Sequence, residues 1–169
     1  MNRRDMLKTA GLAVAGATLL GAEAFASENK KQSKYRKALV IGAHPDDPEG
    51  NVGGTMLRLR QAGWEVVSVY LTRGEGGIKG KNNDEAAAIR SQEAINACKI
   101  LDARPVFMTQ IDGNTEINKA RYAEMKELIA NENPDIVFTH WPIDGHPDHR
   151  VCSILVFDAW RRLNYNFEL

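Results

Sequence analysis

The stretch KALVIGAHPDDPE at residues 37–49 joins an apolar run to a cluster of polar side chains. Residues 38–43 are all apolar or glycine, which predicts a strand covered on both faces of a sheet. The polar residues from His44 to Glu49 then begin where the chain leaves this strand. Open α/β sheets bind their ligands beyond the carboxyl ends of their strands, so these residues form a candidate functional site.

A second polar cluster, His146-Pro147-Asp148-His149, lies about a hundred residues further along and follows another apolar run at 135–140. The two clusters contain three of the chain's four histidines and four acidic side chains. Histidine with carboxylates at the end of a strand is typical of a catalytic or metal site.

Apolar strand-like stretches alternate with helix-like stretches between and around the clusters. We expect strands at 38–43, 64–72, 105–109 and 135–140, and helices at 53–61, 83–101, 118–131 and 147–163. This alternation predicts a Rossmann-like, three-layer α/β/α fold with a mostly parallel sheet of strand order 3-2-1-4. The first and fourth strands are then neighbours, which brings the two clusters together. Because the sequence ends soon after the last helix, we expect the sheet to lack its C-terminal strands.

The N-terminus has the features of an export signal. Arg3 and Arg4 precede an apolar stretch from Gly11 to Ala22, and Ala24-Phe25-Ala26 supplies a cleavage site. We expect residues 1–26 to be a twin-arginine (Tat) signal peptide, 27–36 a basic tail and 37–169 one domain that is periplasmic or extracytoplasmic. The alternative of a membrane anchor is disfavoured because the stretch is short of the roughly 20 residues that a bilayer requires.

The composition excludes one class of partner and predicts the state of the cysteines. The chain has 22 basic and 22 acidic side chains, so it lacks the basic surface of a nucleic-acid-binding protein. Cys98 and Cys152 lie in apolar helical contexts, which predicts buried free thiols.

The residue types in the clusters suit metal-assisted hydrolysis. In an extended loop, Asp46 and Asp47 point in opposite directions, so one can bind a metal while the other faces substrate or water. We expect Pro45 and Pro48 to keep this loop from becoming helical. His146 and His149 stand three residues apart at a helix start, which can bring both rings to one side. Two imidazoles and a carboxylate around an open position suit catalytic zinc, with iron as an alternative.

These motifs, together with Thr72-Arg73-Gly74-Glu75-Gly76-Gly77 and the segment from Arg90 to Glu93, resemble those of the PIG-L (LmbE-like) family of zinc-dependent de-N-acetylases. The resemblance covers roughly residues 37–161. It implies that the zinc ligands are His44, Asp47 and His149. Asp46 would then be the general base that acts on the zinc-bound water. His146 would stabilise the tetrahedral intermediate and protonate the leaving amine, and Asp148 would orient His146.

Other polar residues near the motifs are assigned supporting roles. The resemblance supports a contact between Arg73 and sugar hydroxyls. We expect Glu49, Glu75 and Arg90 to hold the loops and ligands in place. Trp141 and Asp144 either line the substrate pocket or only pack the loop before His146.

The resemblance implies an exported zinc hydrolase that removes the acetyl group from an N-acetylglucosamine-type sugar conjugate and releases acetate and a free amine. We expect no nucleic-acid partner and no stable membrane anchor. Two alternatives remain at this stage: a non-catalytic, metal-containing carbohydrate-binding protein, and a metallo-hydrolase that acts on another amide or on an ester.

Overall fold

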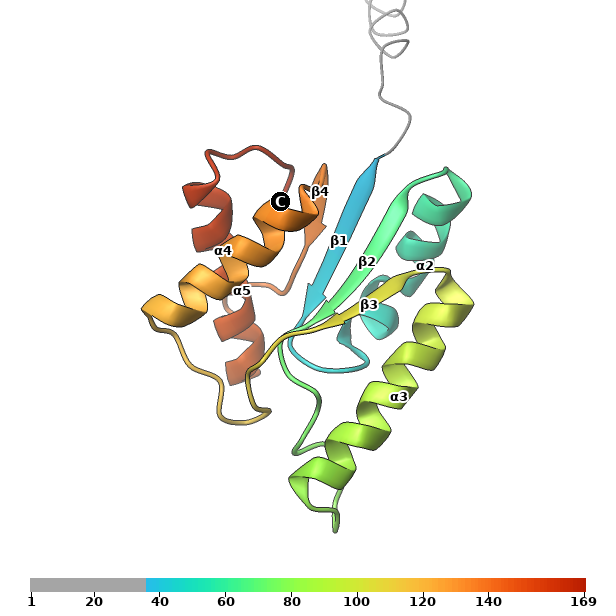
Figure 1. The fold of residues 1–169 in the computed structure, drawn as a ribbon, viewed down its shortest axis with the longest axis vertical. Helices are drawn as coiled ribbons and strands as arrows, with labels where there is room; N and C mark the ends of the chain where they lie inside the picture. The colour runs from blue at the N-terminus through green and yellow to red at the C-terminus, as the bar shows by residue number, and fades with distance from the viewer. Residues whose placement is uncertain (1–35) are drawn as a thin grey trace, which may run out of the picture. The chain divides into compact units, whose positions relative to one another are not determined.

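Four parallel strands in the order β3-β2-β1-β4 form the centre of the fold (Figure 1). The computed structural model describes residues 36–169, so the expected signal peptide and nearly all of the basic tail lie outside the described residues. The strands are β1 (Lys37–Gly42), β2 (Glu65–Tyr70), β3 (Arg104–Phe107) and β4 (Ile136–Phe138). The helices are α2 (Asp47–Gln61), α3 (Asn83–Leu101), α4 (Lys119–Glu132) and α5 (Pro147–Arg162). The predicted α/β class and strand order are confirmed.

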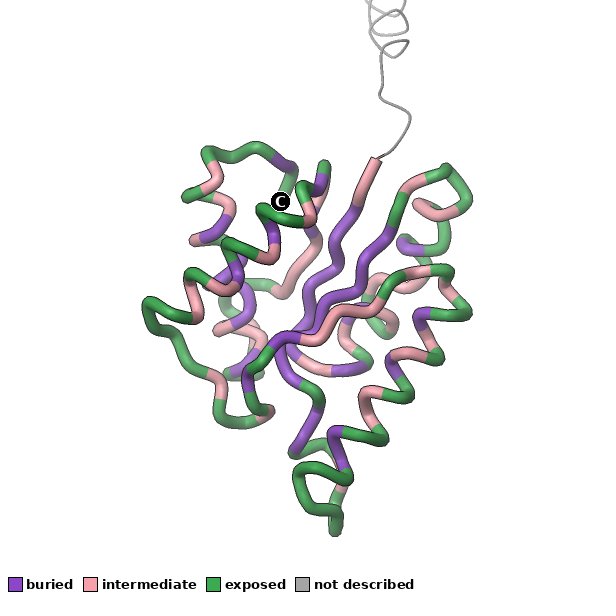
Figure 2. Tube along the Cα trace, viewed as in Figure 1, coloured by how far each residue is buried: buried purple, intermediate pink, exposed green. Residues whose placement is uncertain are grey.

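Side chains from successive residues of β1 pack into two different cores. Leu39 and Ile41 belong to a large apolar cluster that includes Met125 of α4 and Leu155 of α5. The intervening residue Val40 packs with residues of α2 on the other face. Figure 1 accordingly shows α4 and α5 on one side of the sheet and α2 and α3 on the other, and Figure 2 shows β1 and β2 as the most continuously buried segments. The three-layer arrangement follows from this alternation.

The helix ends are set by short polar side chains. The Asn82 side chain accepts the Glu85 backbone N–H, and the Glu85 side chain accepts the Asn82 backbone N–H in return. Asn118 caps α4 in a similar way by accepting two backbone N–H groups. Asp102 and Asn133 end α3 and α4 in the left-handed conformation, which Asn and Asp adopt more readily than most residues. Cys98 and Cys152 are free and buried, as predicted.

Helix α2 starts six residues earlier than predicted, at Asp47 rather than at residue 53. Asp46 takes a left-handed conformation with φ 104°, which turns the chain directly from the end of β1 into the helix. The expectation that Pro48 keeps this segment out of a helix is therefore wrong. Proline is tolerated in the first turn of a helix because the N–H groups there have no partner within the helix.

The fourth strand is shorter than predicted, because the chain leaves the sheet after Phe138. On the edge of β4 away from β1, Glu168 forms an isolated parallel bridge with Ile136. The Val137 N–H donates to the Glu168 carbonyl at 2.8 Å, and the Glu168 N–H donates to the Asp135 carbonyl at 2.9 Å. The described residues therefore contain four strands and one further parallel bridge. No helix within residues 36–169 combines the length and apolar character needed to cross a membrane.

Gly42 permits the close approach of α2 to β1, which gives a first prediction. A Cβ atom at this position would lie 2.7 Å from both Asp47 Cβ and Pro48 Cδ. We expect Gly42→Ala to lower the free energy of unfolding by about 1–3 kcal/mol, as overpacking of a filled site does. Urea denaturation measures this change.

The matched control is Gly54→Ala in the same helix, where a Cβ atom would contact nothing within 4 Å. Alanine is favoured over glycine inside a helix, so this variant should gain roughly 0.5–1 kcal/mol. Equal stability of the two variants would contradict the packing argument.

Candidate metal centre and active site

All four histidines of the chain lie together at the carboxyl ends of β1 and β4. The His146 ring centroid lies 4.8 Å from that of His44 and 4.7 Å from that of His149. The expectation that these three histidines meet is confirmed. The fourth, His140, is stacked on His149 with ring centroids 3.8 Å apart. The sequence predicts His140 only as the last residue of a strand.

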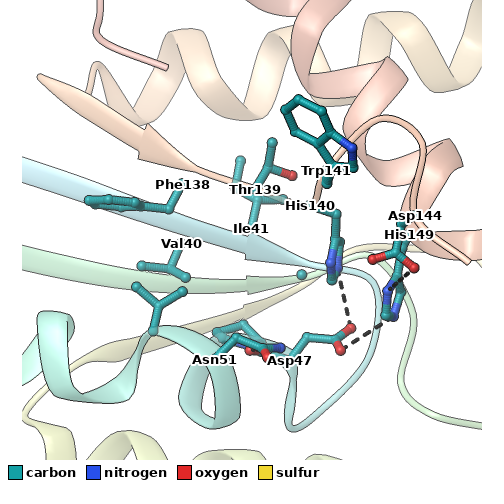
Figure 3. A pocket seen from close by; sticks show the side chains of 13 residues that line it. Val40, Ile41, Asp47, Asn51, Phe138, Thr139, His140, Trp141, Asp144 and His149 are labelled. Carbon is teal, nitrogen blue, oxygen red and sulfur yellow. Dashed lines mark hydrogen bonds and ion pairs between the residues drawn. The ribbon is translucent and has the colours of Figure 1, made fainter. Parts of the chain in front are cut away.

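The Asp47 carboxylate lies between these rings. Its Oδ2 atom accepts the backbone N–H of His44 at 2.8 Å and lies 3.2 Å from His44 Nδ1. Its Oδ1 atom lies 3.3 Å from His149 Nε2, and only 10% of the side chain is exposed. Figure 3 shows Asp47 projecting from the start of α2 toward His140 and His149. One carboxylate thus contacts rings that come from three separate segments of the chain.

The spacing of these donors fits a bound metal ion. Two ligand atoms that each lie about 2.0–2.1 Å from a tetrahedral zinc ion are roughly 3.3–3.4 Å apart. The contacts of Asp47 with His44 and His149 are close to this value. Among the described residues, three groups of side chains offer donor atoms that all lie within 4.8 Å of one another: His44 with His146 and His149, Asp47 with His140 and His149, and His44 with Asp112 and Asp148. Imidazole and carboxylate together suit a divalent transition metal.

A buried carboxylate fixes the far side of the His44 ring. Asp148 Oδ2 lies 3.0 Å from His44 Nε2, and Asp112 Oδ1 lies 3.2 Å from the same nitrogen. Asp148 also accepts the Gly113 N–H at 2.8 Å and the Thr115 hydroxyl at 2.6 Å. Burial lowers the pKa of His44, but hydrogen bonds with Asp47 and Asp148 outweigh it and raise that pKa to about 9. A ligand histidine that donates its second N–H to a carboxylate is a common arrangement at metal sites.

The position of Asp148 differs from the expected pairing with His146. Only its backbone N–H contacts His146, by donating to Nδ1 at 3.2 Å. Its carboxylate points instead into the loop between β3 and α4, where Gly113 and Thr115 hold it against His44. These partners come from a loop whose position the motif alone does not define.

Asp46 and His146 line a cleft next to His44. This cleft has a volume of about 330 Å³ and is lined by His44, Asp46, Gly74, Gly76, Gly77, Arg90, Asp112 and His146. The Asp46 carboxylate is 65% exposed and accepts a hydrogen bond from Arg90 Nη2 at 2.6 Å. Arg90 also donates to the Pro45 carbonyl, so it holds the turn at Asp46. The two residues expected to move protons therefore face one space.

The glycine-rich loop is tied to the site through Glu75. This buried carboxylate accepts the backbone N–H groups of Arg73 and Asp112, both at 3.1 Å. The Arg73 side chain is half exposed and lies 3.4 Å from Glu75 through Nε. Glu49 accepts the Tyr70 hydroxyl at 3.1 Å, and burial raises the pKa of Glu49. Glu75 and Arg90 thus have the loop-fixing contacts expected, whereas Glu49 contacts β2.

A second cleft, of about 300 Å³, opens beside Asp47 and is shown in Figure 3. Trp141 and Asp144 line it together with His140 and His149. Asp144 Oδ1 accepts the His146 N–H at 2.7 Å and lies 3.2 Å from His149 Nδ1. Trp141 and Asp144 were expected either to line a pocket or only to pack the loop before His146. Both residues lie in the wall of this cleft.

Two side chains of the site were not identified from the sequence. His140 lies two residues after the end of β4, and Asp112 lies five residues after the end of β3. Both occupy the carboxyl edge of the sheet, where the two clusters were expected. Polar side chains at the last position of a predicted strand, as well as those shortly after it, are therefore candidates for this edge.

Comparison with known proteins extends these observations. Residues 39–160 match the family model described as PIG-L, GlcNAc-PI de-N-acetylase. A diacetylchitobiose deacetylase from Thermococcus kodakarensis is 33% identical over 138 residues, covering 78% of this chain and 51% of that protein. A probable N-acetyl-alpha-D-glucosaminyl L-malate deacetylase 2 from Bacillus subtilis is 33% identical over 133 residues, covering 73% of this chain and 60% of that protein.

Solved structures with the same fold include proteins of different chemistry. The N,N'-diacetylchitobiose deacetylase from Pyrococcus horikoshii is 29% identical with a TM-score of 0.70, covering 75% of this chain and 49% of that one. A 4-carboxy-2-hydroxymuconate hydratase from Pseudomonas putida KT2440 has a TM-score of 0.69 at 24% identity, covering 73% of this chain and 55% of that one, which is evidence for the fold alone. The chain spans about half to three fifths of the length of these relatives.

The contact between Asp148 and His44 yields a second prediction. We expect Asp148→Asn to weaken zinc binding by about 10–100-fold, because the amide no longer offers two carboxylate oxygens to orient and charge-balance His44. Competition with a chromogenic chelator measures the zinc dissociation constant.

Asp102→Asn is the control, since Asp102 ends α3 at the opposite edge of the sheet and pairs only with Arg60 in the described structure. It should bind zinc like the unsubstituted protein. Unchanged zinc affinity of Asp148→Asn would show that this carboxylate does not position His44.

Proposed function

The chain belongs to the PIG-L family of GlcNAc-PI de-N-acetylases, and on this premise we propose that its site hydrolyses the N-acetyl group of an N-acetylglucosamine-type sugar conjugate. The products are acetate and a free amine. The observation that carries the proposal is the Asp47 carboxylate in contact with His44 and His149, beside a cleft that exposes Asp46 and His146. The side chains proposed as metal ligands thus adjoin those proposed to transfer protons.

The proposed metal is zinc, held by His44, Asp47 and His149. This set of two imidazoles and one carboxylate leaves an open position, as catalytic zinc sites do. When bound, zinc would polarise the amide carbonyl and lower the pKa of a water molecule. The charge of Asp47 and the donor spacing around it support this assignment.

Asp46 is the proposed general base. Its carboxylate faces the cleft and is largely exposed, so it can accept a proton from the attacking water. Arg90 donates to the same carboxylate at 2.6 Å and fixes its direction. Because Asp46 lies next to Asp47 in the chain, the base is held at a constant distance from the ligand set.

His146 is the proposed group that stabilises the developing oxyanion and returns a proton to the leaving nitrogen. Its Nδ1 accepts the Asp148 backbone N–H, so Nε2 is the nitrogen with a proton to donate. The ring is exposed at the cleft, where a substrate carbonyl or amine can reach it. The N-terminus of α5 beneath it also favours negative charge.

The substrate class is inferred from the relatives and from the polar cleft walls. The printed names of the Thermococcus and Bacillus proteins describe deacetylases of N-acetylglucosamine-containing compounds. In this chain Asp112 and the backbone of the glycine loop offer hydrogen-bonding groups to a sugar. Arg73, half exposed on that loop, is the further side chain proposed to contact sugar hydroxyls.

A third prediction tests the proposed reaction with N,N'-diacetylchitobiose as the probe. The zinc-loaded protein should release acetate, and Asp46→Asn should keep its zinc but lower kcat by about 10²–10⁴-fold, as loss of a general base does. Asparagine tolerates the positive φ at this position, so the turn is expected to remain intact. Acetate release and metal content are measured on the same samples.

Asp102→Asn again serves as the control and should retain full turnover. A zinc-loaded protein that is inert on a panel of N-acetylated sugars would overturn the proposal. Faster release of acetate from O-acetyl than from N-acetyl versions of one sugar would instead assign the site to ester hydrolysis.

The location of the protein is a separate proposal, based on Arg3 and Arg4 ahead of the apolar stretch. We propose export by the Tat route. Replacing both arginines with lysine keeps the charge but not the guanidinium groups, so the protein should remain in the cytoplasm of a Tat-competent bacterium. Fractionation with immunoblotting checks this, and continued export of the double variant would refute it.

A further inference from the structure

His140 is the histidine for which the proposed reaction has no role. It follows β4, and 10% of its side chain is exposed. Its Nε2 atom lies 3.4 Å from Asp47 Oδ2, which is close enough for His140 to be a fourth metal ligand. Its other contacts decide between a ligand and a supporting residue.

The first contact is a hydrogen bond from the backbone of β1. Parallel pairing of β1 with β4 ends at Val40 and Phe138, three residues before Ala43. The Ala43 N–H is buried and donates to His140 Nε2 at 2.9 Å. The side chain of His140 therefore supplies the acceptor that the departing backbone of β4 no longer offers. Buried backbone N–H groups require such an acceptor.

This bond determines the state of Nε2. A peptide N–H can only donate, so Nε2 must present its lone pair to Ala43, and the proton of the neutral ring is on Nδ1. A ring nitrogen has a single lone pair in the ring plane. Nε2 therefore cannot bind a metal while it accepts the Ala43 N–H, nor can it donate a proton to Asp47.

The second contact is with the His149 ring. The two rings are stacked, with an angle of 9° between their planes and 3.8 Å between their centroids. The nitrogens of His149 meanwhile approach two carboxylates, Asp47 through Nε2 and Asp144 through Nδ1. The two carboxylates lie near the ring nitrogens of His149 and so orient the ring within its own plane. His140 packs against one face of that ring.

We propose that His140 is a positioning residue of the metal centre, which it supports without being a ligand. It joins the two parts of the donor set, because it holds the backbone directly before His44 and stacks on His149 from α5. This inference rests on the proposed metal site and adds a residue to it. It predicts that both the hydrogen-bond acceptor and the flat ring of His140 contribute to metal affinity.

Two substitutions separate these contributions. His140→Gln keeps an acceptor for the Ala43 N–H but removes the ring, whereas His140→Phe keeps a ring over His149 but removes the acceptor. Each should weaken zinc binding by about 10-fold, the lower end of the range for residues that support metal ligands. His149→Gln is the comparison for loss of a true ligand and should weaken binding much more. Asp102→Asn, at the residue that ends α3 at the opposite edge of the sheet, should have no effect.

The visible spectrum of the cobalt-substituted protein provides a readout other than activity. At saturating cobalt, the spectra of both His140 variants should match the unsubstituted protein in band position and intensity, because no ligand is lost. A His140→Gln spectrum altered in the same way as that of His149→Gln would make His140 a ligand and overturn the proposal. Unchanged zinc affinity in both His140 variants would also overturn it.

Two measurements keep the interpretation unambiguous. Circular dichroism and thermal unfolding without metal establish that each variant folds, and His140→Gln is expected to fold because it retains the acceptor. Absence of zinc binding by the unsubstituted protein would refute the proposed function itself. Normal zinc binding and acetate release with unaffected His140 variants would refute only this inference.

Discussion

The close contact between Gly42 and the first turn of α2 is the constraint on which the site depends. With no side chain at residue 42, the helix can begin directly above the end of β1, and Asp47 becomes its first residue. The Asp47 carboxylate is then carried by a rigid helix start into the space between β1 and β4. The loops that bear the histidines meet at this space because parallel strands end at the same edge of a sheet. The donor set is thus assembled by backbone geometry.

The left-handed turn at Asp46 gives two adjacent carboxylates different surroundings. A φ of 104° is uncommon for a residue with a side chain, and such conformations persist where surrounding contacts impose them. Arg90 provides such contacts by binding the Pro45 carbonyl and the Asp46 carboxylate together. Asp46 consequently faces an open cleft while Asp47 is enclosed by imidazoles. A helix that started at residue 53, as predicted from the sequence, would lack this division.

Periodicity and strand-end chemistry predicted the layers, the strand order and the meeting of His44, His146 and His149, because these depend on local pattern and on general rules for parallel sheets. The partners of individual side chains were not predictable in the same way. Asp148 contacts His44 because a distant loop presents Gly113 and Thr115 to it. His140 is the last residue of the predicted strand 135–140, whereas β4 in the structure ends two residues earlier, at Phe138. The contacts of Asp148 and of His140 both depend on the residue at which a strand ends. Secondary-structure propensity locates such an end only to within a few residues.

Protonation and metal binding compete at His44, and the surrounding carboxylates stabilise both states. With its pKa raised to about 9, the metal-free ring carries two protons near neutral pH, one toward Asp47 and one toward Asp148. A metal ion held by His44 would take the place of the first proton and leave the second on Nε2, which donates it to Asp148, so metal uptake would release a proton. In either state a positive group lies next to Asp47. Buried carboxylates require such a partner, which explains how the donor set can be held in place before any metal is bound.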